Sequence, residues 1–218
     1  AHARRRLKML CLNDDSPRPL TEKVLERPRV IARLREWITE HRPAYLTCYN
    51  TTMLERQLAL ELGIPLKGVD PILLDLGTKS GSRQTFAAAN VPHPAGFEDL
   101  HTEDEIVSAL CQLATLRPNI RSAVVKINEG FSGEGNGVFR YPESKTDETQ
   151  VRESLQNLEW SSAQENTQSF LRKYKQMGGI VEEMIEGEEV RSPSVQMRIQ
   201  PDGNAVLVSS HEQVLGGN

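Results

Sequence analysis

The sequence is poor in cysteine and contains no long hydrophobic run. Its 218 residues include three cysteines, Cys11, Cys48 and Cys111, which share no metal-ligand spacing. An odd and sparse set of this kind favours a reducing compartment and buried free thiols over a disulfide framework. No segment reaches the roughly 18 apolar residues needed to span a bilayer, and no signal peptide is visible. These absences argue against disulfide-rich secreted and integral membrane proteins, and we expect a cytoplasmic location.

An excess of charge of one sign is also lacking. Lys and Arg number 26, Asp and Glu number 30, and the net charge is −4. This balance gives no electrostatic reason to expect nucleic acid or an anionic membrane as a partner. Hydrophobic residues make up 38% of the chain, which is ordinary for a globular protein and enough for one large or two small domains. The oligomeric state is not readable from the sequence.

Strand and helix patterns alternate at the start of the sequence. The apolar run at 7–12 and the segment 44–49 have strand character. Between them, apolar positions recur at helical spacing from 24 to 38, and Pro28 is able to begin a second helix after a short first one. A strand, helix, strand, helix order at this spacing favours a parallel sheet covered by helices.

The helix that follows the second predicted strand has clear signals at both ends. Thr52 is followed three residues later by Glu55, which is the capping-box pattern, and Gly63 is placed to end the helix. Residues 1–76 are therefore expected to form a small α/β domain.

The patterns of the later sequence are less regular. We expect residues 142–166, which are polar, to form a mobile insertion without a readable function. The alternation of apolar and polar residues from 195 to 199 predicts a half-buried strand, with a turn and a return strand after it. The other predicted elements are a helix at 102–116, a strand at 123–127, a strand at 138–141 and a helix near 166–177.

A lysine at the end of a strand leads into a glycine-rich loop. Lys126 is followed by Gly130, Gly133, Gly135 and Gly137. Glycine permits close approach and positive φ, so such a loop can present backbone N–H groups to phosphate oxygens, and the lysine adds a charge for the same anion. A hairpin turn that needs glycine is an equally good interpretation of these residues alone. The loop is neither a Walker A loop nor a dinucleotide fingerprint.

Two further features add to this pattern. Lys79 stands just before a predicted helix, although a lone lysine in a turn is more often a solvated charge. The segment 180–190 ends a strand with five carboxylates among the eight residues from 182 to 189. Such a cluster repels itself unless some members have partners, such as ligand hydroxyls, an amino group or arginine.

Taken together, these segments resemble the ATP-grasp superfamily. Lys79, the segment 91–96, the stretch 126–136 and the stretch 181–189 occur in the order seen in those enzymes. Residues 49–56 resemble the pre-ATP-grasp domain of peptide-forming and amino-acid ligases. Within the superfamily, the stretch 126–136 is most similar to pheganomycin-type peptide ligases.

The resemblance implies an α/β fold with two parts. A small Rossmann-like pre-ATP-grasp domain would cover residues 1–76, and an incomplete ATP-grasp α+β domain would cover 77–218. The implied activity is an ATP-dependent carboxylate–amine ligase that forms an acylphosphate, with ATP and Mg²⁺ as cofactors and small-molecule carboxylate and amine substrates. Mg²⁺ ligands in the family lie on later strands, so we expect the metal site and the catalytic residues beyond Asn218, with this chain as a truncated part of the enzyme.

Two other interpretations remain open. One is a catalytically inactive ATP-binding module of a larger multidomain protein. The other is a plain α/β structural or interaction domain, in which the lysines, the loop and the acidic cluster occur together by coincidence. An acidic residue followed by Glu-x-Asn after Asn218 would favour the ligase over the module.

The resemblance also implies roles for individual residues. Two lysines would contact the ATP phosphates, the glycine loop would cover the β- and γ-phosphates, and the acidic segment would bind adenosine. Glu182 would accept from the adenine amino group, the backbone of Glu183 and Ile185 would read the ring edge, and Glu189 would bind the ribose. The complete implied set is Lys79, Lys126, Ser132, Gly133, Glu134, Gly135, Asn136, Gly137, Glu182, Glu183, Ile185 and Glu189. Substrate contacts could fall at Arg191, His211 and Gln213.

Overall fold

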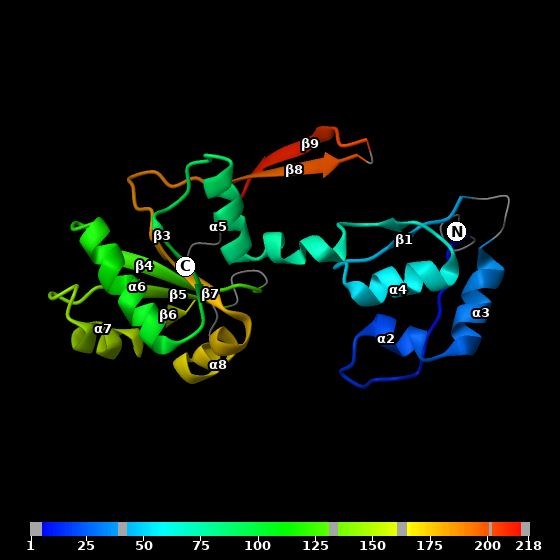
Figure 1. Cartoon of the computed structure of the whole chain (residues 1–218), viewed down its shortest axis with the longest axis horizontal. Coiled ribbons are helices and arrows are strands. Elements are labelled where there is room, and N and C mark those ends of the chain that lie inside the picture. The colour runs from blue at the N-terminus through cyan, green and yellow to red at the C-terminus, as the bar shows by residue number, and fades with distance from the viewer. Residues whose placement is uncertain (1–5, 39–42, 131–134, 161–164, 201, 215–218) are drawn as a thin grey trace. The chain divides into compact units, whose positions relative to one another are not determined.

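The computed structural model describes residues 6–38, 43–130, 135–160, 165–200 and 202–214. The chain divides into two compact units, residues 1–93 and residues 94–218, and each is described by itself (Figure 1). In the part of the chain that the structure describes, no helix has the length and apolar character needed to cross a membrane.

The first unit places helices around a short parallel sheet. Strands β1 and β2 pair in parallel with Leu46 opposite Leu66, so a parallel pair forms as predicted, but its second strand at 66–67 was not among the predicted strands. Its small core contains the buried side chains of Val24, Ile31 and Leu58. The elements are α2 (Leu20–Leu25), α3 (Pro28–Trp37), β1 (Leu46–Thr47), α4 (Met53–Leu62), β2 (Leu66–Lys67), the 3₁₀ helix η1 (Pro71–Gly77) and α5 (Lys79–Ala88).

The predicted capping of helix α4 is confirmed at both ends. The Thr52 N–H donates to Glu55 Oε2 at 2.8 Å, and Thr52 Oγ1 accepts from the Leu54 N–H at 3.2 Å. At the other end Gly63 adopts φ 67°, the left-handed conformation that closes a helix with least strain when the residue is glycine. Local chemistry alone therefore sets the limits of this helix.

The predicted strand at 7–12 is wrong. No strand forms over these residues, and Cys11 is exposed. Cys11 Sγ instead donates to Asn13 Oδ1 at 3.3 Å, and Asn13 adopts φ 51°, so a local turn replaces sheet pairing. Cys48 and Cys111 are only half-buried, so the expectation of buried thiols is also wrong.

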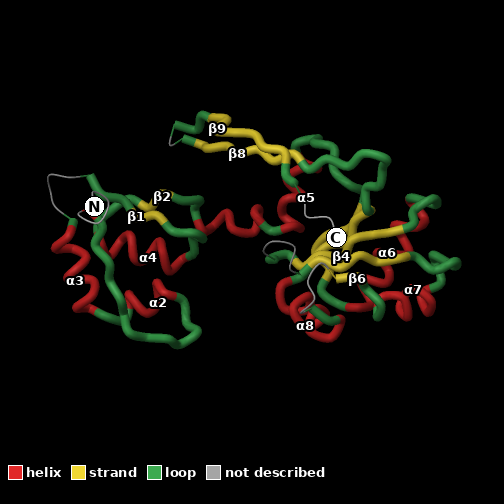
Figure 2. Tube along the Cα trace, turned by 180° about the vertical axis from the view of Figure 1, so that it is seen from behind, coloured by secondary structure: helices red, strands yellow, loops and turns green. Residues whose placement is uncertain are grey.

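The second unit is built on an antiparallel five-stranded sheet, whose strands are yellow in Figure 2. The strand order is β3-β7-β4-β5-β6. The helices and strands predicted at 102–116, 123–127, 138–141 and 166–177 are confirmed within two residues at each end. The elements are β3 (Gly96–Leu100), α6 (Glu103–Leu116), β4 (Ser122–Ile127), β5 (Asn136–Arg140), α7 (Glu148–Leu155), β6 (Glu159–Trp160), α8 (Thr167–Met177), β7 (Gly179–Glu183), β8 (Pro193–Ile199) and β9 (Ala205–Glu212).

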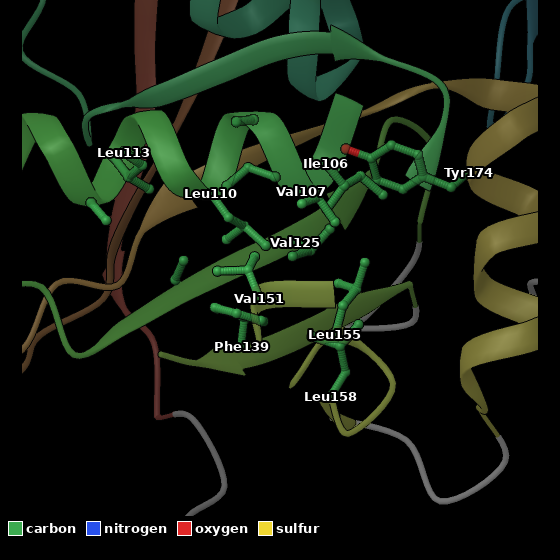
Figure 3. Close-up of a cluster of buried hydrophobic side chains, with 14 of the residues drawn as sticks. Ile106, Val107, Leu110, Leu113, Val125, Phe139, Val151, Leu155, Leu158 and Tyr174 are labelled. Carbon is green, nitrogen blue, oxygen red and sulfur yellow. The ribbon is translucent and has the colours of Figure 1, made fainter. Parts of the chain in front are cut away.

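One face of this sheet forms the hydrophobic core. Val125, Phe139 and Val181 are fully buried there against side chains of α6, α7 and α8, including Leu110 and Tyr174 (Figure 3). Because successive side chains on a strand point to opposite faces, the alternate residues of β4, β5 and β7 lie on the other face.

The expected mobile insertion at 142–166 is wrong over its described part. Residues 148–155 form α7, and residues 159–160 form β6. Val151 and Leu155 are four residues apart, so both lie on one face of α7, and both are fully buried. Asp147 caps the helix by accepting from the Thr149 N–H at 2.9 Å.

The predicted hairpin near the end of the chain is confirmed, but its burial is not. Strands β8 and β9 pair in antiparallel fashion, with Ile199 opposite Ala205. Val195, Met197 and Ile199 alternate as predicted, yet their exposed fractions are 57%, 63% and 77%. Among the described residues these two strands pair only with each other, and the exposed fractions show that these apolar positions are not packed into a core.

Candidate functional site

Lys126 and Glu182, two of the residues singled out in the sequence, lie together on the face of the sheet opposite the core. They come from neighbouring antiparallel strands, β4 and β7, with Val124 directly opposite Glu182. The Lys126 ammonium donates to Glu182 Oε1 and forms an ion pair with it. The exposed fractions of the two side chains are 26% and 12%, so this pair of charges is largely withdrawn from water.

Asn136 lies beside this ion pair on strand β5, directly opposite Lys126. Its side-chain Oδ1 is buried and has no hydrogen-bond partner among the described residues. A buried polar atom without a partner costs free energy, so this oxygen is suited to accept a hydrogen bond from a ligand or water. We call the face that carries Lys126, Asn136 and Glu182 the polar face.

The polar face also has an apolar strip. Val124 on β4 and Val138 on β5 are directly opposite each other, and both are half-buried. They adjoin Glu182 on one side, because Val124 is its partner on β7. A flat apolar strip next to a cation, a carboxylate and an amide suits a ligand with both a ring and charged groups.

The structure describes the glycine loop between β4 and β5 at its start, residues 128–130, and at its end, Gly135. Gly135 adopts φ 72°, and a Cβ there would lie 2.3 Å from Ile127 Cδ1, so glycine is required. The Gly135 carbonyl accepts from the Ile127 N–H at 2.9 Å, and Gly137 is already within β5. Ser132, Gly133 and Glu134, which were predicted to cover phosphates, lie outside the described residues.

Glu183, at the end of β7, faces the core side rather than the polar face. Its Oε1 accepts from the Ala95 N–H at 2.8 Å, and its Oε2 accepts from Arg117 Nε at 3.0 Å. The Glu183 N–H donates to the Ala95 carbonyl at 2.8 Å. The carboxylate therefore holds the end of the strand in place, and only the backbone carbonyl remains for the predicted role.

The segment after β7 is held by a second carboxylate, which the sequence analysis did not single out. Glu186 Oε1 accepts from Ser122 Oγ at 3.0 Å, and Glu186 Oε2 forms an ion pair with Arg121. The Arg121 guanidinium and then the Ser122 hydroxyl lower the pKa of Glu186 below its usual value. Ile185 lies just before Glu186 and is 62% exposed.

A cavity of about 470 Å³ opens next to this segment. Residues 116–121 and 183–186 line it. Lys126, Asn136 and Glu182 are not among its lining residues, so this cavity is distinct from the polar face. Its charged side chains, Arg117 with Glu183 and Arg121 with Glu186, neutralise one another.

The remaining predicted residues of the second unit have local partners among the described residues. Glu189 and Arg191 are exposed and form an ion pair, with Arg191 Nε 2.7 Å from Glu189 Oε1. His211 on β9 has its Nε2 2.9 Å from Ser209 Oγ, and Gln213 Oε1 accepts from Ser192 Oγ at 2.9 Å. These contacts do not bring any of the three predicted substrate residues to the ion pair of the polar face.

Lys79 belongs to the first unit, where it is the first residue of α5. The Thr78 side chain caps this helix by accepting from the Gly81 N–H at 3.0 Å. Arg83 follows one turn after Lys79 on the same side of α5 and is buried, which the sequence analysis missed. A second basic residue four positions after the lysine was the signal that could have found it.

A set of metal ligands does not form among the described residues. No group of three or more His, Cys, Asp or Glu side chains in that part of the chain is placed to hold a metal ion. We therefore assign no Mg²⁺ ligands to it.

Comparison with a known family gives a match in the middle of the chain. Residues 72–168 match the family model described as IQCH-like, ATP-grasp. This segment contains Lys79, Lys126 and the glycine loop, and it ends before Glu182.

Two curated proteins are similar to the chain over its whole length. An L-propargylglycine–L-glutamate ligase of Streptantibioticus cattleyicolor is 29% identical over 219 residues, which are 100% of this chain and 44% of the ligase. IQ motif-containing protein H of Danio rerio is 24% identical over 253 residues, which are 99% of this chain and 24% of that protein. The chain thus spans less than half the length of either relative.

Two solved structures share the fold. One is D-alanyl-alanine synthetase A of Vibrio cholerae, with a TM-score of 0.51, 13% identity, and coverage of 79% of this chain and 46% of the synthetase. The other is N5-carboxyaminoimidazole ribonucleotide synthetase in complex with ADP, with a TM-score of 0.51, 16% identity, and coverage of 87% and 41%. These similarities confirm a partial ATP-grasp-like fold of mixed helices and strands.

Proposed function

We propose that this chain, whose residues 72–168 match an ATP-grasp family model, binds ATP on the polar face of its five-stranded sheet. We propose further that the protein is a ligase that joins a carboxylate to an amine through an acylphosphate. Its relative from Streptantibioticus cattleyicolor is named for two amino acids, so amino acids are the substrate class that we propose.

The observation that carries the proposal is the group formed by Lys126, Glu182 and Asn136. A lysine is a compact charge that suits phosphate oxygens, and a largely buried carboxylate can accept from an amino group on a base. When ATP binds, the Lys126 ammonium can turn from Glu182 toward a phosphate. A carboxylate oxygen of Glu182 can then accept a hydrogen bond from the adenine amino group. The half-buried strip of Val124 and Val138 would support the ring.

The described residues fit ATP and not, by themselves, Mg²⁺. The unpaired Asn136 oxygen, beside Lys126, offers an acceptor to the nucleotide or to its bound water. When bound, ATP supplies the phosphoryl group that activates the carboxylate. The chain's own contribution to that step is to orient the phosphates and to offset negative charge with Lys126, and in our proposal with Lys79 and the glycine loop as well.

We propose that the two parts of the chain have the roles that the resemblance to the ATP-grasp superfamily implies. Residues 1–76 would be the pre-ATP-grasp domain, and residues 77–218 would hold the nucleotide. The ring edge would meet the backbone at Glu183 and Ile185, and Glu189 would bind the ribose. Arg191, His211 and Gln213 remain candidates for substrate contacts, and Mg²⁺ ligands would come from outside the described residues.

An ATP-binding module without ligase activity is the second candidate. The observation in its favour is that the matching family model and one relative both take their names from IQ motif-containing protein H. Amine-dependent ADP release by the intact protein, assayed against pools of amino acids, separates the two. Release that requires an added amine supports the ligase, and binding of ATP without release supports the module.

We expect Mg²⁺·ATP to raise the melting temperature of the intact protein. A ligand that binds only the native state stabilises it by about 2.7 kcal/mol at a hundred times its dissociation constant. Differential scanning fluorimetry in an ATP series, with Mg²⁺ alone as the control, measures the shift. A melting temperature that does not change at millimolar Mg²⁺·ATP contradicts the proposed site.

A further inference from the structure

The short segment from Glu183 to Glu186, which we call the linker, is fixed to the sheet at both ends. At its start, the Glu183 carboxylate binds the Ala95 N–H and Arg117. At its end, the Glu186 carboxylate binds Ser122 and Arg121. Two side-chain anchors on four residues hold a segment that lies outside any helix or strand beyond Glu183.

The anchors leave a particular pair of backbone groups available. The Glu183 N–H donates to the Ala95 carbonyl, and a regular antiparallel pair would return the Ala95 N–H to the Glu183 carbonyl. That N–H donates to the Glu183 carboxylate instead, so the carbonyl lacks this donor. The Met184 N–H donates to the Ser122 carbonyl at 3.2 Å, whereas Ile185 is exposed and its N–H has no partner among the described residues.

A carbonyl followed two residues later by a free N–H can distinguish purine bases. Adenine offers an amino donor next to a ring-nitrogen acceptor, which matches an acceptor and a donor on the linker. Guanine offers an oxygen acceptor next to an N–H donor, which reverses both contacts. A site built to pair a polar group rejects a base that leaves that group unpaired, so selectivity depends on how firmly the two backbone groups are held.

Glu186 is the anchor nearest to the Ile185 N–H. We propose that Glu186 is a positioning residue that, through Ser122 and Arg121, holds this N–H in place and so sets the preference of the site for adenine over guanine. This inference rests on the proposed ATP site. Glu186 does not touch the nucleotide itself, and it acts through the linker backbone.

A hydrogen bond from Arg140 orients the Ser122 hydroxyl toward Glu186. Ser122 is 1% exposed, and its Oγ accepts from Arg140 Nη1 at 2.8 Å. Its own hydroxyl hydrogen is therefore free for Glu186, 3.0 Å away. Arg140 is oriented in turn by Glu159, with both nitrogen–oxygen distances at 3.1 Å, and this pairing raises the pKa of Arg140. Glu186 is thus held by a chain of partners on β4, β5 and β6.

Replacing Glu186 with alanine tests the role directly. We expect Glu186→Ala to weaken ATP binding about tenfold, as for the loss of one hydrogen bond, and to leave GTP binding unchanged. The ATP-over-GTP ratio then falls by the same factor. Isothermal titration of the intact protein with Mg²⁺·ATP and Mg²⁺·GTP gives both affinities, and a thermal melt shows whether the variant folds.

Two companion variants sharpen the test. Glu188→Ala removes an exposed carboxylate just past the linker and should leave the ratio unchanged. Arg121→Ala removes an exposed partner of Glu186 and should lower the ratio in the same direction by a smaller factor. If Glu186→Ala does not fold, the ATP-over-GTP ratio of Arg121→Ala tests the positioning role in its place.

The outcomes separate this inference from the proposed function. A folded Glu186→Ala variant with the wild-type ratio, or with equal losses for ATP and GTP, overturns the positioning role alone. The same holds for an unchanged ratio in Arg121→Ala when Glu186→Ala cannot fold. Wild-type protein that binds no ATP overturns the proposed function, and this inference with it.

Discussion

Replacement of Lys126 by methionine is expected to weaken ATP binding by about 10–100-fold, because a hydrogen bond to a charged group contributes about 1.5–3 kcal/mol. Methionine keeps the aliphatic stem and removes only the ammonium. The substitution also removes the Lys126 charge that offsets Glu182 on the polar face, so the negative charge of Glu182 repels the triphosphate more strongly. Titration of the purified variant with Mg²⁺·ATP measures the effect.

Lys173→Met is the matched control for this variant. Lys173 lies on α8 and forms an ion pair with Glu165, 2.8 Å away. Its replacement therefore also removes an ion pair between a lysine and a carboxylate. That pair is not on the polar face, and its removal should leave ATP affinity unchanged. Equal losses in the two variants would show that Lys126 acts through general charge or stability and not as part of a site.

Phe139→Ala is expected to have the largest effect on stability, at about 3–5 kcal/mol. Phe139 is fully buried on the core face of β5, and its ring meets that of Tyr141 edge to face with centroids 4.9 Å apart. Truncation removes that aromatic contact and leaves a cavity beneath α6 and α7, which a close-packed core fills only in part. Chemical denaturation followed by circular dichroism measures the free energy of unfolding.

Leu116→Ala provides the comparison on the surface. Leu116 ends α6 and is exposed, so its truncation should change the free energy of unfolding by no more than about 0.5 kcal/mol. If both variants unfold at the same denaturant concentration as the wild type, the core shown in Figure 3 is wrongly assigned.

Much of the fold was predictable because its signals are local. The capping box of Thr52 and Glu55, the left-handed Gly63 and the proline at the start of α3 act within one turn of a helix, so they can be read from a single sequence. Helix α7 was missed because its own local signal is weak. Its eight residues need only Val151 and Leu155 to reach the core, and two apolar side chains in a polar segment give little periodic signal.

The apolar run at 7–12 shows the opposite error. Its composition suits a buried strand, but pairing depends on a partner far away in the sequence, and a turn at Asn13 competes locally. The wrong prediction that β8 is half-buried also arises from a dependence on distant residues. Alternation reports which side chains share a face, but whether another layer covers that face is decided elsewhere.

Some residues of the candidate site could be predicted from local sequence, and others could not because they meet only in the folded structure. Lys126 and Glu182 were predictable because each belongs to a recognisable stretch, and the structure brings them together across 56 residues of sequence. The anchor of Glu186 was not predictable, because Ser122 and Arg121 are ordinary residues at the start of a strand and meet Glu186 only across 64 and 65 residues. The unpaired oxygen of Asn136 needs three-dimensional burial to be noticed at all.

The most direct test of the account is a crystal structure of the intact protein with Mg²⁺ and a non-hydrolysable ATP analogue. We predict triphosphate density within hydrogen-bond distance of Lys126 Nζ and the adenine edge against the backbone of Glu183 and Ile185. An analogue whose triphosphate lies in the cavity beside Arg117 and Arg121, with no density near Lys126 or Glu182, would contradict the central claim.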